Sequence, residues 1–285
     1  MIAITGATGQ LGRLVIDALL ASVPASQIVA AVRNPAKAAD LAAKGIAVRE
    51  ADYSKPETLA GAFAGVDKLL LISSSEVGQR TAQHTAVIDA AKAAGVKLLA
   101  YTSLLHADTS PLALAAEHVA TEQALKASGL PHVLLRNGWY VENYLLALPT
   151  ALEHGALLGA AGEGRISAAS RADYAAAAAA VLTSAEDQAG RVHELAGDES
   201  YSLAELAAEI AAQAGKPVVY NNLPEAAYKD VLVSVGLPEG FAALLADSDA
   251  GAAKGALFDG GKGIGALTGK ATVTVKAAVA AALKG

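Results

Sequence analysis

The chain has 285 residues, a formal net charge of −6 and no cysteine. The acidic balance argues against nucleic acid or an anionic membrane as the main partner, because either needs a basic surface. The absence of cysteine excludes disulfides, thiol nucleophiles and thiolate metal sites. No apolar run reaches the length of a membrane span, so we expect a cytoplasmic protein.

The first twelve residues predict a strand, a glycine turn and a helix. Residues 1–5 are apolar, glycines follow at positions 6, 9 and 12, and residues 10–21 show helical apolar spacing. Such glycines permit the tight turn, the approach of backbone N–H groups to a phosphate, and close packing of helix on sheet. Unpaired N–H groups at the helix start suit a pyrophosphate. We therefore predict a dinucleotide site rather than a purely structural turn, with contacts from Gly6, Ala7, Thr8, Gly9, Gln10 and Leu11.

Strand and helix patterns alternate over the first half of the chain, which predicts an α/β fold with a Rossmann-like, doubly wound parallel sheet. The expected strands cover residues 27–32, 46–51, 68–73, 96–102 and 132–137, and the expected helices cover residues 80–94 and 112–128. A further helix should begin near Ser54, with Ser54 and Glu57 as a capping box and Pro56 in the first turn.

The alternation of strand and helix patterns ends after residue 137, and helical patterns predominate from there on. We expect helices at residues 144–153, 172–183, 203–214, 225–235 and 275–283, and short strands at 192–195 and 218–222. Ser202 and Glu205 form a second capping-box pattern, and the glycine-spaced stretches 159–164 and 260–265 are interpreted as loops. The predicted organisation is a dinucleotide-binding domain at 1–139 and a smaller, mostly helical substrate lobe at 140–285, partly interleaved with the sheet.

Arg33 follows the second expected strand, about twenty residues after the glycine turn, and no acidic residue lies between positions 27 and 37. An acidic residue there would bind the ribose 2′-hydroxyl of NAD, whereas arginine accommodates the extra phosphate of NADP. The sequence thus favours NADP(H), with a surface arginine unrelated to the cofactor as the alternative.

Hydroxyl side chains end two later strands. Ser73, Ser74 and Ser75 follow the fourth strand, and Tyr101-Thr102-Ser103 closes the fifth. Ligands of open α/β sheets bind beyond the carboxyl ends of the strands, so these groups are predicted to line the cofactor, although serines also cap helices and satisfy loop backbone. Asp52 is a candidate contact of the adenine amino group, with the start of a turn as the alternative.

Several segments together resemble the NmrA-like group of atypical short-chain dehydrogenases, and within it the bacterial NADPH:quinone oxidoreductases of the second type. They are the glycine turn with Arg33, His118-Val-Ala-Thr-Glu122, the stretch from Leu135 to Tyr144 that reads Leu-Arg-Asn-Gly-Trp-Tyr-Val-Glu-Asn-Tyr, and three shorter motifs near residues 171, 194 and 244. The resemblance implies NADPH lying across the sheet, a quinone pocket between the lobes, and no bound flavin or metal. It also implies a segment that closes over the nicotinamide, with cofactor contacts from Asn137, Gly138, Trp139, Tyr140 and Glu142.

The chain departs from typical short-chain dehydrogenases in the helix after the fifth strand. Their Tyr-x-x-x-Lys pair is replaced by Leu114 and His118, which makes alcohol or ketone chemistry improbable because no proton relay of that kind can operate. A quinone needs only a hydride and a later proton. The candidate catalytic residues are Asn143 and Tyr140, as donors to a quinone oxygen, and His118, as an orienting group. Each has a purely structural alternative. Asn143 could cap the following helix, Tyr140 could pack between the lobes, and His118 could be a helix residue whose hydrogen bonds are satisfied within the protein.

Two function classes follow. The first is NADPH-dependent reduction of a small-molecule quinone, with reduction of an imine or activated double bond as a variant. The second is an NADP(H)-binding redox sensor that regulates a partner protein without turnover. The sequence carries no signal for an oligomeric state.

Overall fold

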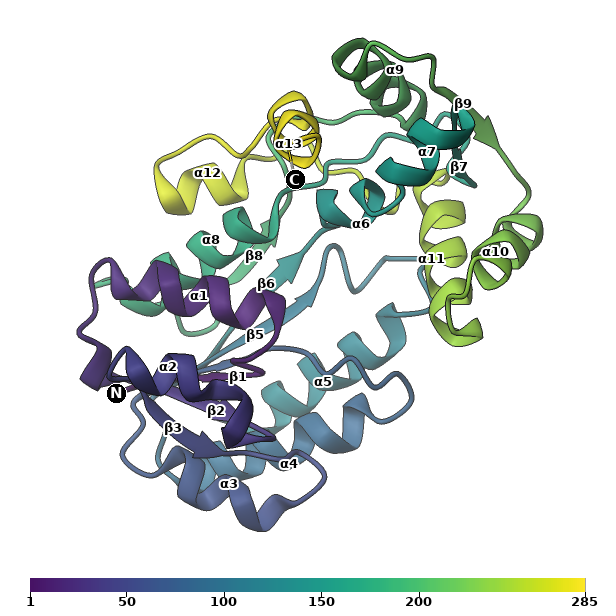
Figure 1. The fold of residues 1–285 in the computed structure, drawn as a ribbon. Helices are drawn as coiled ribbons and strands as arrows, with labels where there is room; N and C mark the ends of the chain where they lie inside the picture. The colour runs from purple at the N-terminus through teal and green to yellow at the C-terminus, as the bar shows by residue number, and fades with distance from the viewer. Residues whose placement is uncertain (285) are drawn as a thin grey trace. The chain divides into compact units, whose positions relative to one another are not determined.

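A computed structural model describes residues 1–284 (Figure 1). The chain divides into two compact units. Unit 1 comprises Met1–Ala107, Ala116–Asn137 and Arg171–Glu194, and unit 2 comprises Asp108–Ala115, Gly138–Ser170 and the chain from Leu195 onward. The chain therefore passes back and forth between the units, and residues 171–194 return to the first of them.

Unit 1 is built on a seven-stranded sheet in the order β3-β2-β1-β4-β5-β6-β8. The strands are β1 (Ile2–Thr5), β2 (Ile28–Val32), β3 (Ala47–Glu50), β4 (Lys68–Leu71), β5 (Leu98–Leu104), β6 (His132–Asn137) and β8 (Val192–Leu195). The pairs from β3 through β6 are parallel. The winding direction reverses between β1 and β4, which is where such sheets bind ligands. The prediction of a Rossmann-like, doubly wound sheet is confirmed.

Helices cover both faces of this sheet (Figure 1). One face carries α1 (Gln10–Leu20), α2 (Ala39–Ala43) and α8 (Arg171–Thr183), and the other carries α3 (Pro56–Phe63), α4 (Arg80–Ala93) and α5 (Ala115–Ser128). Short 3-10 turns, η1 (Ala25–Gln27) and η2 (Pro35–Ala38), flank β2. Phe63 of α3 and Ile88 of α4 share one buried cluster with Leu69 and Leu71 of β4. Burial on both faces explains why β4 is almost entirely apolar.

Unit 2 is mostly helical. Its elements are α6 (Val141–Leu145), α7 (Leu148–His154), β7 (Ala156–Gly159), α9 (Leu203–Ala214), β9 (Val219–Asn222), α10 (Glu225–Ser234), α11 (Glu239–Ala252), α12 (Gly263–Thr268) and α13 (Val275–Ala282). Strands β7 and β9 form a parallel pair of their own. The capping box of Ser202 and Glu205 at the start of α9 is confirmed. Within residues 1–284, no helix combines the length and apolar character needed to cross a membrane.

The single helix expected over residues 144–153 is wrong. The structure has two short helices there, because α6 ends at Leu145 and α7 begins at Leu148 with Pro149 in its first turn. Proline lacks the N–H group and clashes with the carbonyl one turn earlier, so it is tolerated at a helix start and breaks a helix interior.

The capping box expected at Ser54 is also wrong. Helix α3 does begin at Pro56, but the residue before it is Lys55, which makes no side-chain cap. The loop is held by Asp52 instead: its carboxylate accepts a hydrogen bond from the Ser54 N–H, and its own N–H donates to the hydroxyl of Thr58. An aspartate turn thus replaces the serine cap.

Three elements of unit 2 lack a sequence signal, namely β7, α11 and α12. The buried face of α11 includes Ser248 and Asp249, so the helix does not show the apolar periodicity by which amphipathic helices are recognised. Helix α12 begins at Gly263, inside the glycine-spaced stretch that was expected to be a loop.

Candidate active site

The glycine turn joins β1 to α1 with the geometry that its spacing predicts. Gly6 has a φ of +58°, and its carbonyl oxygen accepts a hydrogen bond of 2.9 Å from the N–H of Gly9. A Cβ atom on Gly12 would lie 2.8 Å from the Cα of Ala7 and closer still to the Gly6 carbonyl oxygen. Helix α1 has no side-chain cap at its start, so its first N–H groups are available to an anion.

A cavity of about 360 Å³ opens beside this turn. Three groups of sequence-predicted residues meet in it: the glycine turn, Arg33 after β2, and the serines after β4. The lining residues are Gly6, Thr8, Gly9, Gln10, Leu11, Gly12, Arg33, Ala51, Asp52, Tyr53, Ser54, Ile72, Ser73, Ser74, Ser75, Glu76 and Gln83. The carboxyl ends of parallel strands lie at one edge of a sheet, which is why segments far apart in sequence converge here. Ala7 is fully buried beneath the turn.

Arg33 carries an internal counterion at the cavity. Its Nη1 lies 2.7 Å from Oε1 of Glu76, and the other carboxylate oxygen accepts a hydrogen bond of 2.7 Å from Gln83. The hydrogen bond from Gln83 and then the one from Arg33 lower the pKa of the Glu76 carboxyl. Glu76 and Gln83 had no distinguishing sequence signal, because nothing local links them to Arg33.

The serine loop after β4 is fixed by two side chains from other elements. The N–H of Ser73 donates to Oγ1 of Thr102 at the end of β5, and the N–H of Ser74 donates to Nε2 of His84 on α4, both at 2.9 Å. Because a backbone N–H can only donate, Nε2 is the acceptor, and the neutral ring donates from Nδ1 to Thr121. Burial, and secondly the charge of Arg80, lower the pKa of His84 to about 4.

His118 lies inside unit 1 and is not among the residues that line the cavity. It is 5% exposed, and its Nδ1 is 2.8 Å from the hydroxyl of Tyr101. Burial, followed by the charge of Arg80, lowers the pKa of His118 to about 3, so the ring is neutral at physiological pH.

Asn137 ends β6. Its carbonyl oxygen accepts a hydrogen bond of 2.9 Å from the N–H of Leu105, which follows β5. The side chain is 7% exposed, and its Oδ1 has no hydrogen-bond partner among residues 1–284. A buried oxygen without a donor is costly in a folded protein and indicates a place where a ligand donor fits.

The remaining predicted residues belong to unit 2 and surround the start of α6. Tyr140 precedes the helix and pairs with Ala169 as an isolated bridge, and Asn143 donates its N–H to the Tyr140 carbonyl oxygen. The ring centroid of Trp139 is 6.4 Å from that of Tyr144. The hydroxyl of Tyr144 donates to the buried carboxylate of Asp249, which ties α6 to α11.

Comparison with known proteins identifies the family. The model of the NmrA-like family matches residues 1–265. The chain belongs to the NmrA-like family. This confirms the resemblance carried by the glycine turn, Arg33 and the segment around Trp139.

One curated relative and two solved structures are informative about this NmrA-like chain. Quinone oxidoreductase 2 of Escherichia coli (strain K12) is 62% identical over 279 residues, which cover 98% of this chain and 97% of the relative. A crystal structure of an NADPH-dependent quinone oxidoreductase from Escherichia coli in complex with NADPH has a TM-score of 0.97 at 61% identity, over 99% of this chain and 100% of that one. Triphenylmethane reductase of Citrobacter sp., complexed with NADP(H), has a TM-score of 0.95 at 39% identity, over 99% and 100% of the two chains.

Proposed function

We propose that this NmrA-like chain reduces quinones with NADPH. The observation that carries the proposal is the 62% identity to a quinone oxidoreductase along nearly the whole of both chains. The cavity of unit 1 supports it independently, because its residues suit the pyrophosphate, the extra phosphate and a ribose of NADPH.

The fit can be argued from the anionic groups of the cofactor. The uncapped start of α1 and the glycine turn suit a pyrophosphate. The carboxylate of Glu76 at 2.7 Å demonstrates that the guanidinium of Arg33 can hold an anion at this cavity, as the extra phosphate of NADPH requires. The serine loop offers hydroxyl and backbone groups to a ribose, and the unpartnered Oδ1 of Asn137 suits the amide of a nicotinamide.

The cofactor would supply a hydride, which leaves the chain to bind, orient and exclude water. We assign cofactor binding to unit 1 and the substrate lobe to unit 2. Within unit 2, we propose that Tyr140 and Asn143 donate hydrogen bonds to a quinone oxygen, and that Gly138, Trp139 and Glu142 contact the cofactor. Helix α6 suits this role because Tyr144 and Asp249 fix its position in unit 2.

The test is the consumption of NADPH by the purified protein with a benzoquinone or a naphthoquinone, with NADH and enzyme-free controls. Fast oxidation of NADPH and much slower oxidation of NADH is the expected result. Tight binding of NADPH without turnover of any quinone would overturn the proposal and favour an NADP(H)-binding regulator. The variant Asn143→Ala should lower kcat for the quinone while leaving NADPH bound.

A further inference from the structure

His106 has an unusual backbone conformation. Among residues 1–284 it is the one non-glycine residue with a positive φ, at 51°. A side chain in this left-handed region costs on the order of 1–2 kcal/mol, and such residues concentrate at functional sites. His106 lies two residues after the end of β5, and its side chain is 38% exposed.

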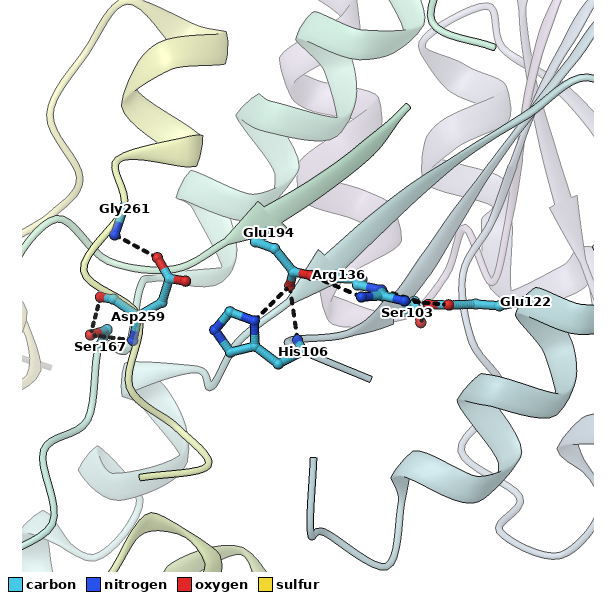
Figure 2. A network of polar contacts seen from close by, with 8 residues as sticks. All are labelled: Ser103, His106, Glu122, Arg136, Ser167, Glu194, Asp259 and Gly261. Carbon is cyan, nitrogen blue, oxygen red and sulfur yellow. Dashed lines mark hydrogen bonds and ion pairs between the residues drawn. The ribbon is translucent and has the colours of Figure 1, made fainter. Parts of the chain in front are cut away.

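A carboxylate holds His106 in this conformation (Figure 2). The backbone N–H of His106 donates to Oε2 of Glu194 at 2.8 Å, and the ring Nδ1 lies 3.6 Å from the same oxygen. Glu194 belongs to β8, which is 88 residues away in the sequence. The backbone of His106 is therefore held by a residue from another strand, and its ring lies beside the same carboxylate.

Glu194 is fixed in turn by a largely buried guanidinium. Its Oε1 lies 2.9 Å from Nη1 of Arg136, and Arg136 also makes two hydrogen bonds of 3.0 and 2.7 Å to Glu122 (Figure 2). The hydroxyl of Ser103 donates to Glu122 at 2.5 Å. The hydrogen bonds that Arg136 donates to both carboxylates raise its pKa, with Glu122 the larger cause. Such doubly bonded pairs add geometric precision as well as energy.

The residues near His106 lie at the carboxyl ends of the parallel strands, which is the edge of the sheet where ligands bind. The preceding residue, Leu105, donates its N–H to the carbonyl oxygen of Asn137, whose Oδ1 has no hydrogen-bond partner within the described residues 1–284. Thr102, four residues before His106, accepts the N–H of Ser73, which lines the cavity. His106 thus lies at the carboxyl end of β5, where ligands of open α/β sheets bind.

We propose that His106 is the proton donor in quinone reduction, oriented by Glu194. The inference rests on the proposed function. The quinone accepts a hydride from NADPH and becomes a hydroquinone monoanion. The N–H bond of the His106 imidazolium then breaks as an O–H bond forms on that anion, which yields the hydroquinone. The imidazole takes its next proton from water, which its partial exposure allows.

Two variants remove the imidazole and keep the backbone conformation, because glycine and asparagine both tolerate a positive φ. In His106→Gly and His106→Asn, kcat for benzoquinone should fall by about a hundredfold, whereas the Kd for NADPH and the midpoint of thermal unfolding should not change. Added imidazole should restore kcat of His106→Gly. His154→Asn, at the exposed end of α7, is the matched control and should neither lose activity nor respond to imidazole.

A spectroscopic measurement complements the kinetics. The Cε1–H resonance of His106, assigned by its loss in His106→Asn, should shift when hydroquinone is added to the protein in the presence of NADP+. Wild-type kcat in either variant, a loss of activity that imidazole does not restore in His106→Gly, or an unmoved resonance would overturn the role of His106. A wild-type protein that does not oxidise NADPH with quinones would instead overturn the proposed function itself.

Discussion

The guanidinium of Arg33 and the carboxylate of Glu76 are in direct contact, with Nη1 and Oε1 2.7 Å apart, although 43 residues separate them. Both line the cavity of unit 1, and Gln83 holds the second carboxylate oxygen of Glu76. An anion of the protein therefore sits on the residue that we propose to bind the extra phosphate of NADPH. The two anions compete for Arg33.

Removing the charge of Glu76 should tighten NADPH binding. In Glu76→Gln, Arg33 no longer has an internal counterion and the phosphate meets no carboxylate. Exposed ion pairs contribute up to about 1 kcal/mol, so Kd for NADPH should fall by about two- to fivefold while Kd for NADH stays constant, as measured by fluorescence titration. Asp230→Asn, which removes a charge from α10, is the control. Weaker NADPH binding by Glu76→Gln would mean that Glu76 positions Arg33 rather than competing with the phosphate.

Reversing the charge of Arg33 should act on NADPH alone. A charge-assisted contact with phosphate contributes about 1.5–3 kcal/mol, or about a ten- to hundredfold difference in Kd. In Arg33→Asp, the Kd for NADPH should rise by that factor. The Kd for NADH should not change, because NADH has no phosphate at this position. Equal losses for both nucleotides, measured in the same titration, would remove the assignment of Arg33.

A methyl group at Gly12 should damage the glycine turn. Its Cβ would lie 2.8 Å from the Cα of Ala7, which backbone atoms cannot relieve by rotation. Gly12→Ala should therefore lower the free energy of unfolding by about 1–3 kcal/mol and weaken NADPH binding. Gly61→Ala on α3 is the matched control, since its Cβ meets nothing within 4 Å and should stabilise the helix. Urea unfolding of both variants measures the difference.

His84 should make unit 1 sensitive to acid. Burial lowers its pKa from 6.5 to about 4 in the folded protein, so the unfolded chain binds the proton first. The contribution of neutral His84 to the free energy of unfolding is therefore fully present above pH 6.5. It is lost as the pH falls toward 4, and the loss amounts to about 3 kcal/mol. His84→Gln should flatten the pH dependence of the unfolding free energy in that window. An unchanged slope would contradict the burial of a neutral imidazole.

Asp249 in unit 2 should act with the opposite sign. Burial raises its pKa from 3.8 to about 6, so the folded protein keeps a proton that the unfolded chain has lost. Stability from this residue should decline by about 3 kcal/mol as the pH rises from about 4 to 6. In the variant Asp249→Asn, the asparagine side chain can still accept a hydrogen bond from the N–H of Ala160 and can donate one to the hydroxyl of Tyr144. The unfolding free energy of the wild type relative to Asp249→Asn should therefore fall across this window, and a constant difference would show that the carboxyl is not protonated.

The glycine turn and the position of Arg33 at the sheet edge were predictable, because both depend on residues that are close together in the sequence. The run from Gly6 to Gly12 predicts its own turn through steric demands that only glycine meets. The position of Arg33 after a strand places it at the sheet edge together with Ser73, since parallel strands end on the same side. By contrast, the apolar pattern of residues 144–153 predicted one helix, although Pro149 divides this stretch into two.

Other features depend on contacts that have no local signature. The sequence by itself determined the alternating fold and the glycine turn, and it predicted a preference for a phosphorylated cofactor, because steric and periodic rules act between near neighbours. Only the tertiary structure decided that Glu76 meets Arg33, that His84 holds Ser74, and that Glu194 orients His106 across 88 residues. Such pairings follow from how strands order themselves in the sheet, so folding alone brings these side chains together.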